Sequence, residues 1–149
     1  MAGKEKIVVD ASVVTKWFSL EEDSAEALQY KESHVEGGVE LIAPALLLYE
    51  VANALNYKPD FTEEDLKESM RALEDLSISI KLPTKDIMER AIIIARKYGI
   101  SIYDSSYIAL AESLNARMVT SDKRLLEKMG DHPLVHLLGN PKKNPAERQ

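Results

Sequence analysis

Four acidic residues occur where a folded chain could use their carboxylates in chemistry. Asp10 directly follows a short β-branched run, and Asp122 follows another by two residues. Asp104 lies near the start of a long apolar segment, and Glu50 lies in the middle of one. Carboxylate oxygens are hard ligands that suit Mg²⁺ or Mn²⁺, and such ions can activate a water and stabilise the oxygens of an in-line displacement at phosphorus. If the four carboxylates converge, they predict metal-dependent phosphodiester chemistry.

The three aspartates also have simpler structural explanations. Asp10 and Asp122 could each cap the N-terminus of the helix that follows it. Asp104 fits the capping-box pattern Ser101-x-x-Asp104 and would interact favourably with the helix dipole there. For each aspartate taken alone, capping and function both stay open.

Glu50 is harder to explain as an ordinary surface residue. It borders the predicted core-facing stripe of its helix, and the nearest cation in that segment is Lys58, eight residues on. A carboxylate removed from water costs several kcal/mol unless it is paired or bound to a metal. The alternative is a position at the rim of the core, with the carboxylate reaching solvent.

The charge balance is compatible with such a site. The chain has 25 acidic and 19 basic residues, a net charge of −6. Setting aside the four acids leaves 21 against 19, a balance of −2 for the rest of the chain. Clustered carboxylates without a cation would repel one another, whereas bound divalent ions would let an acidic protein hold a polyanion at the site.

The elements that must position these residues alternate between strand and helix. Strands are predicted over residues 6–9, 39–43, 77–82, 117–120 and 134–138. Helices are predicted over residues 11–20, 22–35, 45–56, 62–76, 84–98, 102–114 and 122–129, with Pro44 in a first helical turn, Thr62-x-x-Asp65 as a capping box and Gly99 as a stop. This alternation predicts an α/β fold, a three-layer α/β/α sandwich around a mainly parallel sheet. Ligands of such sheets bind beyond the carboxyl ends of the strands.

The length of 149 residues fits one domain, expected over residues 1–139, with a loose tail over residues 140–149. Without cysteine there can be no disulfide, thiolate zinc site or cysteine nucleophile. No apolar run is long enough to span a bilayer, and the first residues lack the apolar region of a signal peptide. We therefore expect a soluble, cytoplasmic protein. No dinucleotide or Walker motif is present.

Four segments resemble the motifs of PIN-domain nucleases, most of all the VapC-type toxins of prokaryotic toxin–antitoxin pairs. They occur in the family's order over residues 6–138 and read Ile7-Val8-Val9-Asp10-Ala11-Ser12, Leu48-Tyr49-Glu50-Val51-Ala52-Asn53-Ala54-Leu55, Tyr103-Asp104-Ser105-Ser106-Tyr107-Ile108-Ala109-Leu110-Ala111-Glu112 and Val119-Thr120-Ser121-Asp122-Lys123-Arg124-Leu125-Leu126. The resemblance places Asp10, Glu50, Asp104 and Asp122 on the family's acidic, metal-binding positions, and Ser12 and Thr120 on its supporting hydroxyl positions.

What the resemblance implies is a Mg²⁺- or Mn²⁺-dependent endoribonuclease. It would cut single-stranded or looped RNA by water attack and leave a 5′-phosphate and a 3′-hydroxyl. It would form a homodimer, and a VapB-type antitoxin would insert a C-terminal segment to block the site. The chain has no further acid just after Asp122, where some members carry one, so the resemblance leaves open whether one or two metals bind.

Two other functions stay open. The fold could serve as a PIN-like binding or scaffold module with little turnover. A haloacid-dehalogenase-like phosphatase would also place an aspartate after the first strand, but it needs a second aspartate two residues later, where this chain has Ser12.

Some aromatic, histidine and basic residues have open roles. Tyr49, Tyr57 and Phe61 either form a dimer or antitoxin surface or complete the core. The histidines are expected to be surface or strand residues rather than a ligand set; they are His34, His132 and His136. Several basic residues could contact RNA or be ordinary solvated charges, namely Lys16, Arg90, Arg96, Lys123 and Arg124.

Overall fold

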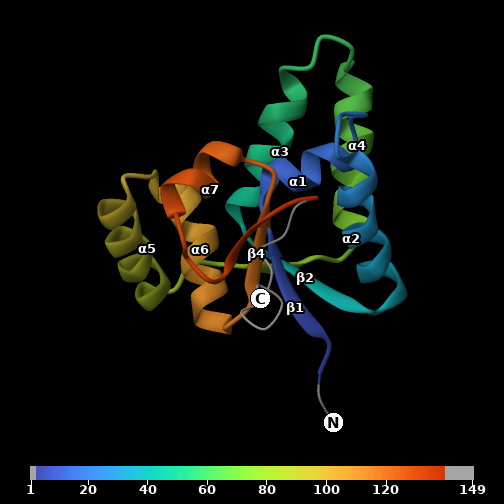
Figure 1. Cartoon of the computed structure of the whole chain (residues 1–149). Coiled ribbons are helices and arrows are strands. Elements are labelled where there is room, and N and C mark those ends of the chain that lie inside the picture. Colours follow the sequence, from blue (N-terminus) through green and yellow to red (C-terminus); the bar gives the residue numbers. More distant parts are fainter. Residues whose placement is uncertain (1–2, 140–149) are drawn as a thin grey trace.

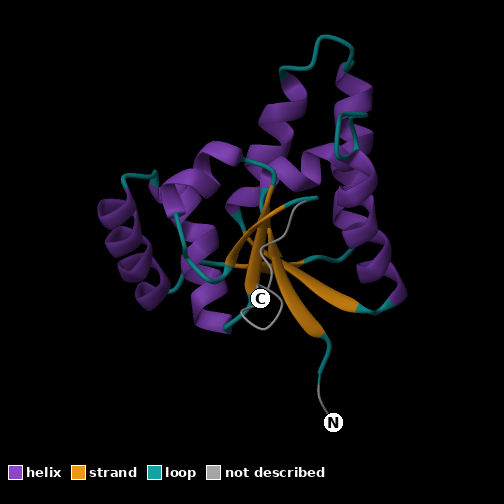
Figure 2. Cartoon of the chain, in the orientation of Figure 1, coloured by secondary structure: helices purple, strands orange, loops and turns teal. Residues whose placement is uncertain are grey.

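A single sheet of five strands, all paired in parallel, forms the centre of the molecule in the computed structural model, which describes residues 3–139 (Figure 2). The strands are β1 (Glu5–Val9), β2 (Val39–Pro44), β3 (Ser79–Lys81), β4 (Arg117–Thr120) and β5 (Val135–Leu137). Their order across the sheet is β3-β2-β1-β4-β5. The predicted α/β class and parallel sheet are confirmed.

Helices cover both faces of this sheet. They are α1 (Ala11–Val14), the 3₁₀ helix η1 (Thr15–Trp17), α2 (Ser24–Glu36), α3 (Leu46–Asn56), α4 (Glu63–Asp75), α5 (Lys85–Tyr98), α6 (Ile102–Leu114) and α7 (Lys123–Met129). Figure 1 shows α5, α6 and α7 on one side of the sheet and α1 to α4 on the other, which gives the expected three layers. None of the helices within residues 3–139 has the length and apolar content needed to cross a bilayer.

The strand order determines where a ligand can bind. The chain moves from β1 outward through β2 to β3, then returns to the other side of β1 and continues through β4 to β5. The direction of winding therefore reverses between β1 and β4, and the crevice beyond their carboxyl ends is the usual binding site of such sheets. Asp10 follows β1 and Asp122 follows β4 at this edge.

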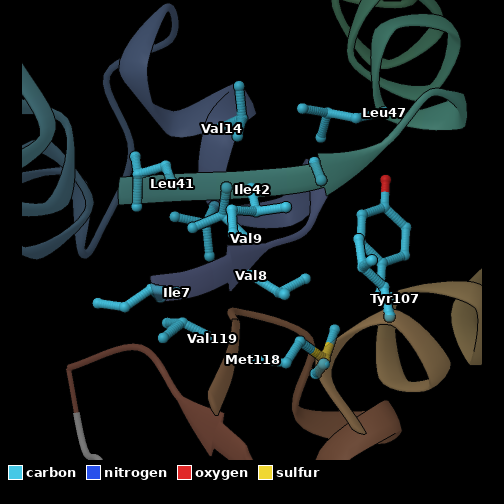
Figure 3. Close-up of a cluster of buried hydrophobic side chains, with 14 of the residues drawn as sticks. Ile7, Val8, Val9, Val14, Leu41, Ile42, Leu47, Tyr107, Met118 and Val119 are labelled. Atoms are coloured by element: carbon cyan, nitrogen blue, oxygen red, sulfur yellow. The ribbon is translucent and has the colours of Figure 1, made fainter. Parts of the chain in front are cut away.

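The central strands are apolar because both of their faces are covered. Ile7, Val8 and Val9 of β1 are completely buried, as are Met118 and Val119 of β4. Figure 3 shows these side chains packed between the helices above and below the sheet. Continuous apolar runs are typical of parallel strands that bury both faces, and they fix the residues just beyond the strand ends.

Several predicted boundaries are corrected. The helix expected over 11–20 ends at Trp17, and α2 begins at Ser24 after Asp23, whose φ of 68° is left-handed. Pro44 is the last residue of β2, opposite Lys81 of β3, so it does not lie in the first helical turn. A strand end tolerates a proline because little of the ladder continues beyond it. The tail predicted over 140–149 lies outside the described residues.

Two of the three predicted helix signals are confirmed. Thr62 and Asp65 form the reciprocal capping box of α4. Gly99 ends α5 with a left-handed φ of 69°, a conformation that glycine adopts without steric cost. This turn matters for function, because α6 begins three residues later and carries Asp104 in its first turn.

Candidate active site

The structure brings the four predicted carboxylates to the same edge of the sheet. Asp10 follows β1, Glu50 lies on α3 after β2, Asp104 lies in the first turn of α6, and Asp122 follows β4. The charges of these groups act on one another. The Asp104 carboxylate helps to raise the pKa of both Asp10 and Glu50, and the Asp122 carboxylate helps to raise the pKa of Asp104. Asp104 is therefore the member that connects the other three.

Asp10 is held by a network of hydroxyl groups. Ser12 Oγ donates to Asp10 Oδ1 over 2.6 Å, and Thr120 Oγ1 donates to Asp10 Oδ2 over 2.5 Å. The strand register explains the second contact, because Val9 lies opposite Val119 and the next residue of each strand is therefore adjacent. The predicted supporting hydroxyls thus both contact the first carboxylate.

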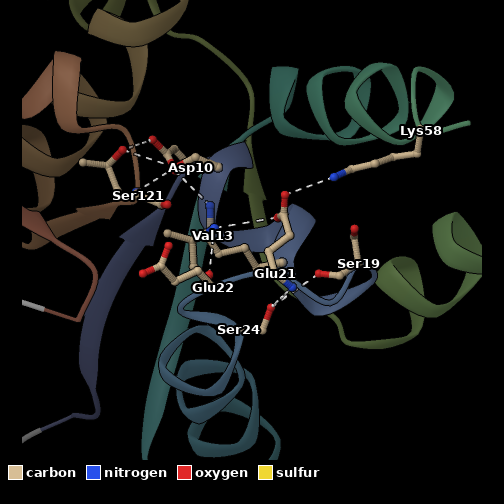
Figure 4. A network of polar contacts seen from close by, with 11 residues as sticks. Asp10, Val13, Ser19, Glu21, Glu22, Ser24, Lys58 and Ser121 are labelled. Atoms are coloured by element: carbon tan, nitrogen blue, oxygen red, sulfur yellow. Dashed lines mark hydrogen bonds and ion pairs between the residues drawn. The ribbon is translucent and has the colours of Figure 1, made fainter.

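The same network ties the two strand ends together. Ser12 Oγ accepts a hydrogen bond from the Ser121 N–H over 2.8 Å, and Thr120 Oγ1 accepts one from the Asp122 N–H over 3.1 Å. Figure 4 shows Asp10 and Ser121 side by side in this network. The hydroxyls therefore hold the β4–α7 turn, and with it Asp122, next to Asp10.

Burial raises the pKa of Asp10 from 3.8 to about 6, although hydrogen bonds from Ser12, Thr120 and Val13 lower it. Between about pH 4 and pH 6, the folded, metal-free protein therefore keeps a proton on Asp10 that the unfolded chain has lost. The stability that Asp10 contributes is complete below about pH 4, decreases through this window, and is lost once the pH has risen through 6. Relative to Asp10→Asn in EDTA, we expect the free energy of unfolding to fall by about 3 kcal/mol between about pH 4 and pH 8. Urea unfolding across this range measures the difference, and a constant difference would contradict the assignment.

Two of the aspartates both cap a helix and belong to the site. Asp10 Oδ1 accepts the Val13 N–H at the start of α1. Asp122 Oδ1 accepts the N–H groups of Arg124 and Leu125 at the start of α7. Capping fixes the side chains, so the two interpretations left open by the sequence are compatible at these positions.

Asp104 forms only half of the capping box that the sequence predicts for α6. Ser101 Oγ accepts the Asp104 N–H over 3.0 Å, as the pattern predicts. Among residues 3–139, however, the Asp104 carboxylate makes no return bond to the Ser101 backbone, in contrast to Asp65 of α4. Burial and the charge of Asp122 raise the pKa of Asp104, while a hydrogen bond between its side chain and that of Ser101 and the charge of Lys128 lower it. The carboxylate therefore interacts with the Ser101 side chain and with charged groups on α7 and in the β4–α7 turn, and not with the backbone of its own cap.

Glu50 is half-buried on α3 and is bound by a residue that the sequence analysis did not single out. Tyr107 of α6 donates its hydroxyl to Glu50 Oε1 over 2.6 Å. Burial raises the pKa of Glu50, the Tyr107 hydrogen bond lowers it, and the charge of Asp104 raises it further. Lys58, the nearest cation of the segment, pairs with Glu21 at 3.0 Å instead, as Figure 4 shows.

The donor set fits a hard divalent cation in its chemistry. All four acids offer oxygen ligands, and burial together with mutual repulsion disfavours the charged forms of three of them. Within residues 3–139, no three His, Asp or Glu side chains already form a group that could hold a metal ion. Binding an ion therefore requires the carboxylate side chains to turn toward one another.

A hollow of about 540 Å³ adjoins Glu50, lined also by Tyr49, Asn53, Asn56 and Tyr103. Tyr49 is 81% exposed, which makes the core alternative wrong for this residue. Tyr57 is likewise 78% exposed, whereas Phe61 packs against the core as that alternative expected. Exposed aromatic side chains thus lie next to a carboxylate of the site.

The remaining candidates lie in other interactions. His34 ends α2 and contacts the backbone of Leu41 and Leu76, and His136 lies in β5. His132 is buried rather than at the surface, with Nε2 at 2.9 Å from Glu112 Oε2. Arg90 pairs with the same glutamate at 2.6 Å. Lys16 lies 3.7 Å from Glu21, so neither basic residue is free of an acidic partner.

The chain is similar to several known proteins in sequence and in fold. Residues 7–131 match the family described as PIN domain. Ribonuclease VapC3 of Pyrobaculum aerophilum is 32% identical over 127 residues, which cover 83% of this chain and 94% of that protein. A toxin–antitoxin complex from Klebsiella pneumoniae contains a similar chain, with a TM-score of 0.65 at 17% identity over 87% of this chain and 94% of that one. VapC20 of Mycobacterium tuberculosis, a toxin that cleaves the sarcin–ricin loop, gives a TM-score of 0.60 at 13% identity over 77% and 87% of the two chains.

Proposed function

The chain belongs to the PIN-domain family, and from this premise we propose that it is a metal-dependent endoribonuclease, the VapC-like toxin of a toxin–antitoxin pair. The observation that carries the proposal is the convergence of Asp10, Glu50, Asp104 and Asp122 at the switch point of the sheet. The relative at 32% identity is itself named a ribonuclease.

The proposed cofactor is Mg²⁺ or Mn²⁺, held by Asp10, Glu50, Asp104 and Asp122. When bound, the ion would supply an activated water and neutralise charge on the phosphate. The chain's own part is to hold the ligands. Ser12 and Thr120 orient Asp10, and the hydrogen bonds of the α7 N-terminus orient Asp122.

The proposed partners are RNA and a VapB-type antitoxin. The hollow is lined by Glu50 and offers a strand of RNA a path to this edge of the sheet, and its exposed tyrosines offer faces on which unpaired bases can stack. The structural neighbour from Klebsiella pneumoniae is a toxin–antitoxin complex, which supports an antitoxin partner for this chain. We also propose a homodimer, which sedimentation velocity of the purified chain tests directly.

The function is tested by incubating the purified protein with a labelled stem-loop RNA in Mn²⁺, in Mg²⁺ and in EDTA. We expect cleavage in either metal and none in EDTA, with products that carry a 5′-phosphate and a 3′-hydroxyl. Ligation to an adaptor that requires a 5′-phosphate identifies the ends. A 2′,3′-cyclic phosphate product would contradict attack by water, because it arises from the ribose 2′-hydroxyl.

The alternative of a binding or scaffold module predicts a different pattern. Such a protein would retain RNA in a filter-binding assay and would leave it intact in every metal. An antitoxin carried through purification would also suppress cleavage, so mass spectrometry of the purified sample is the necessary control. Intact RNA with a partner-free sample would support the module.

A further inference from the structure

We propose that Tyr107 is a positioning residue of the carboxylate site, because its hydroxyl holds Glu50 Oε1 and leaves Oε2 as the oxygen available to a cation. This inference rests on the proposed function, in which Glu50 is a metal ligand. The Tyr107 hydroxyl lies 2.6 Å from Glu50 Oε1. Among residues 3–139, Glu50 Oε2 has no hydrogen-bond partner.

The geometry makes Tyr107 a rigid support. Its side chain is 1% exposed and is one of the largest fully buried side chains of the core. Figure 3 shows the ring standing on α6 with its hydroxyl pointing away from that helix, on the side where Leu47 and the start of α3 lie. A ring fixed by packing on all sides presents its hydroxyl at one place, and this place lies at Glu50.

The position of Tyr107 in the sequence couples two of the carboxylates. Tyr107 lies three residues after Asp104 on α6, and residues with this spacing share a helix face. One helix face therefore carries Asp104 directly and controls Glu50 of α3 through the phenol. The backbone of α6 thus sets the relative positions of two of the four acids.

The hydroxyl can only act as a donor in this contact. A carboxylate oxygen can only accept, and a tyrosine hydroxyl keeps its proton at neutral pH, so the phenol is the donor over the 2.6 Å to Glu50 Oε1. The hydroxyl therefore keeps Glu50 Oε1 occupied. A partner of this kind behind a metal ligand typically changes metal affinity by 10–100-fold when it is removed.

The test compares Mn²⁺ binding by the wild type, Tyr107→Phe and Tyr30→Phe, measured by the loss of the free-ion electron paramagnetic resonance signal. Phenylalanine keeps the packed ring and removes only the hydroxyl. Tyr30 is the matched control, because its hydroxyl accepts a hydrogen bond from Arg117 Nη1 over 3.4 Å, and Arg117 begins β4, at the end of the strand opposite to the carboxylate site. We expect the Mn²⁺ dissociation constant to rise about tenfold for Tyr107→Phe and to stay within about twofold for Tyr30→Phe.

A double-mutant cycle separates positioning from general loosening of the core. In a Glu50→Ala background, Tyr107→Phe should change the Mn²⁺ dissociation constant by less than about twofold, because the hydroxyl has lost the group through which it acts. Equal losses in both backgrounds, or wild-type affinity in Tyr107→Phe, would overturn the inference. A wild type that neither binds Mn²⁺ nor cuts RNA would overturn the proposed function as well, and it is recognised without any variant.

Discussion

Replacing Asp104 by asparagine is expected to lower metal-dependent RNA cleavage by about 1,000-fold or more while leaving the metal-free protein at least as stable as the wild type. The activity falls because Asp104 is one of the proposed metal ligands, and a metal site supplies several kcal/mol of transition-state stabilisation, where 1.36 kcal/mol is a factor of ten. The stability is kept because the substitution removes a charge that burial and Asp122 disfavour. The Ser101 cap persists, since it uses the backbone N–H of residue 104.

Asp86→Asn is the matched control for this variant. Asp86 is also an acidic residue in the first turn of a helix, α5, and it is exposed. Both substitutions lose a similar interaction with a helix dipole, about 0.3–1 kcal/mol. Cleavage rates and thermal unfolding in EDTA are measured for both. If Asp104→Asn lost stability and kept cleavage, Asp104 would be a structural cap and not a member of the site.

Replacing Thr120 by valine is expected to reduce both RNA cleavage and Mn²⁺ affinity by about 10–100-fold. Valine has the shape of threonine without its hydroxyl, so the completely buried position stays filled. The Asp10 carboxylate loses the donor at 2.5 Å, and the Asp122 N–H loses its acceptor. A hydrogen bond to a charged group contributes about 1.5–3 kcal/mol, so the free energy of unfolding at neutral pH should fall by a similar amount.

Thr120→Ser keeps the hydroxyl and is the control. It should retain most of the Mn²⁺ affinity and of the cleavage rate, whereas its stability falls modestly through the loss of a buried methyl group. Isothermal titration with Mn²⁺ and urea unfolding report the two properties separately. Similar Mn²⁺ affinities for the valine and serine variants would show that the Thr120 hydroxyl does not support metal binding.

Much of the fold follows from patterns that act locally. The continuous apolar run at Ile7-Val8-Val9 is what a doubly covered parallel strand requires, and the capping signals at Thr62 and Gly99 mark the ends of α4 and α5. The short length of β3 and the position of Pro44 in β2 could not be predicted from local patterns. Both depend on how far two strands separated along the chain remain paired, which the sequence of either strand does not determine.

Part of the candidate site could likewise be predicted from the sequence, and part of it depends on how the helices pack. The meeting of Asp10 and Asp122 could be predicted, because parallel strands bring their carboxyl ends to one edge and these residues come one and two positions after β1 and β4. Glu50 and Asp104 lie on helices, so the strand ends alone do not fix their positions. Tyr107 could not be assigned a role from the sequence. A tyrosine on an apolar helix face looks like an ordinary core residue until the structure shows α3 packed against α6, with Glu50 at the tyrosine hydroxyl. Its spacing of three from Asp104 was the available signal. Lys128, whose charge acts on Asp104 from α7, gave none.

If a divalent ion held by the four carboxylates drives RNA cleavage, metal occupancy and cleavage must rise together. Mn²⁺ is titrated into the purified protein under single-turnover conditions, and Mn²⁺ occupancy and the cleavage rate of a labelled stem-loop RNA are followed in the same samples. We expect the rate to rise in proportion to occupancy, and Asp104→Asn to show weakened binding with no cleavage at concentrations that saturate the wild type. A cleavage rate that persists in EDTA, or that is equal in Asp104→Asn and the wild type, would contradict this expectation.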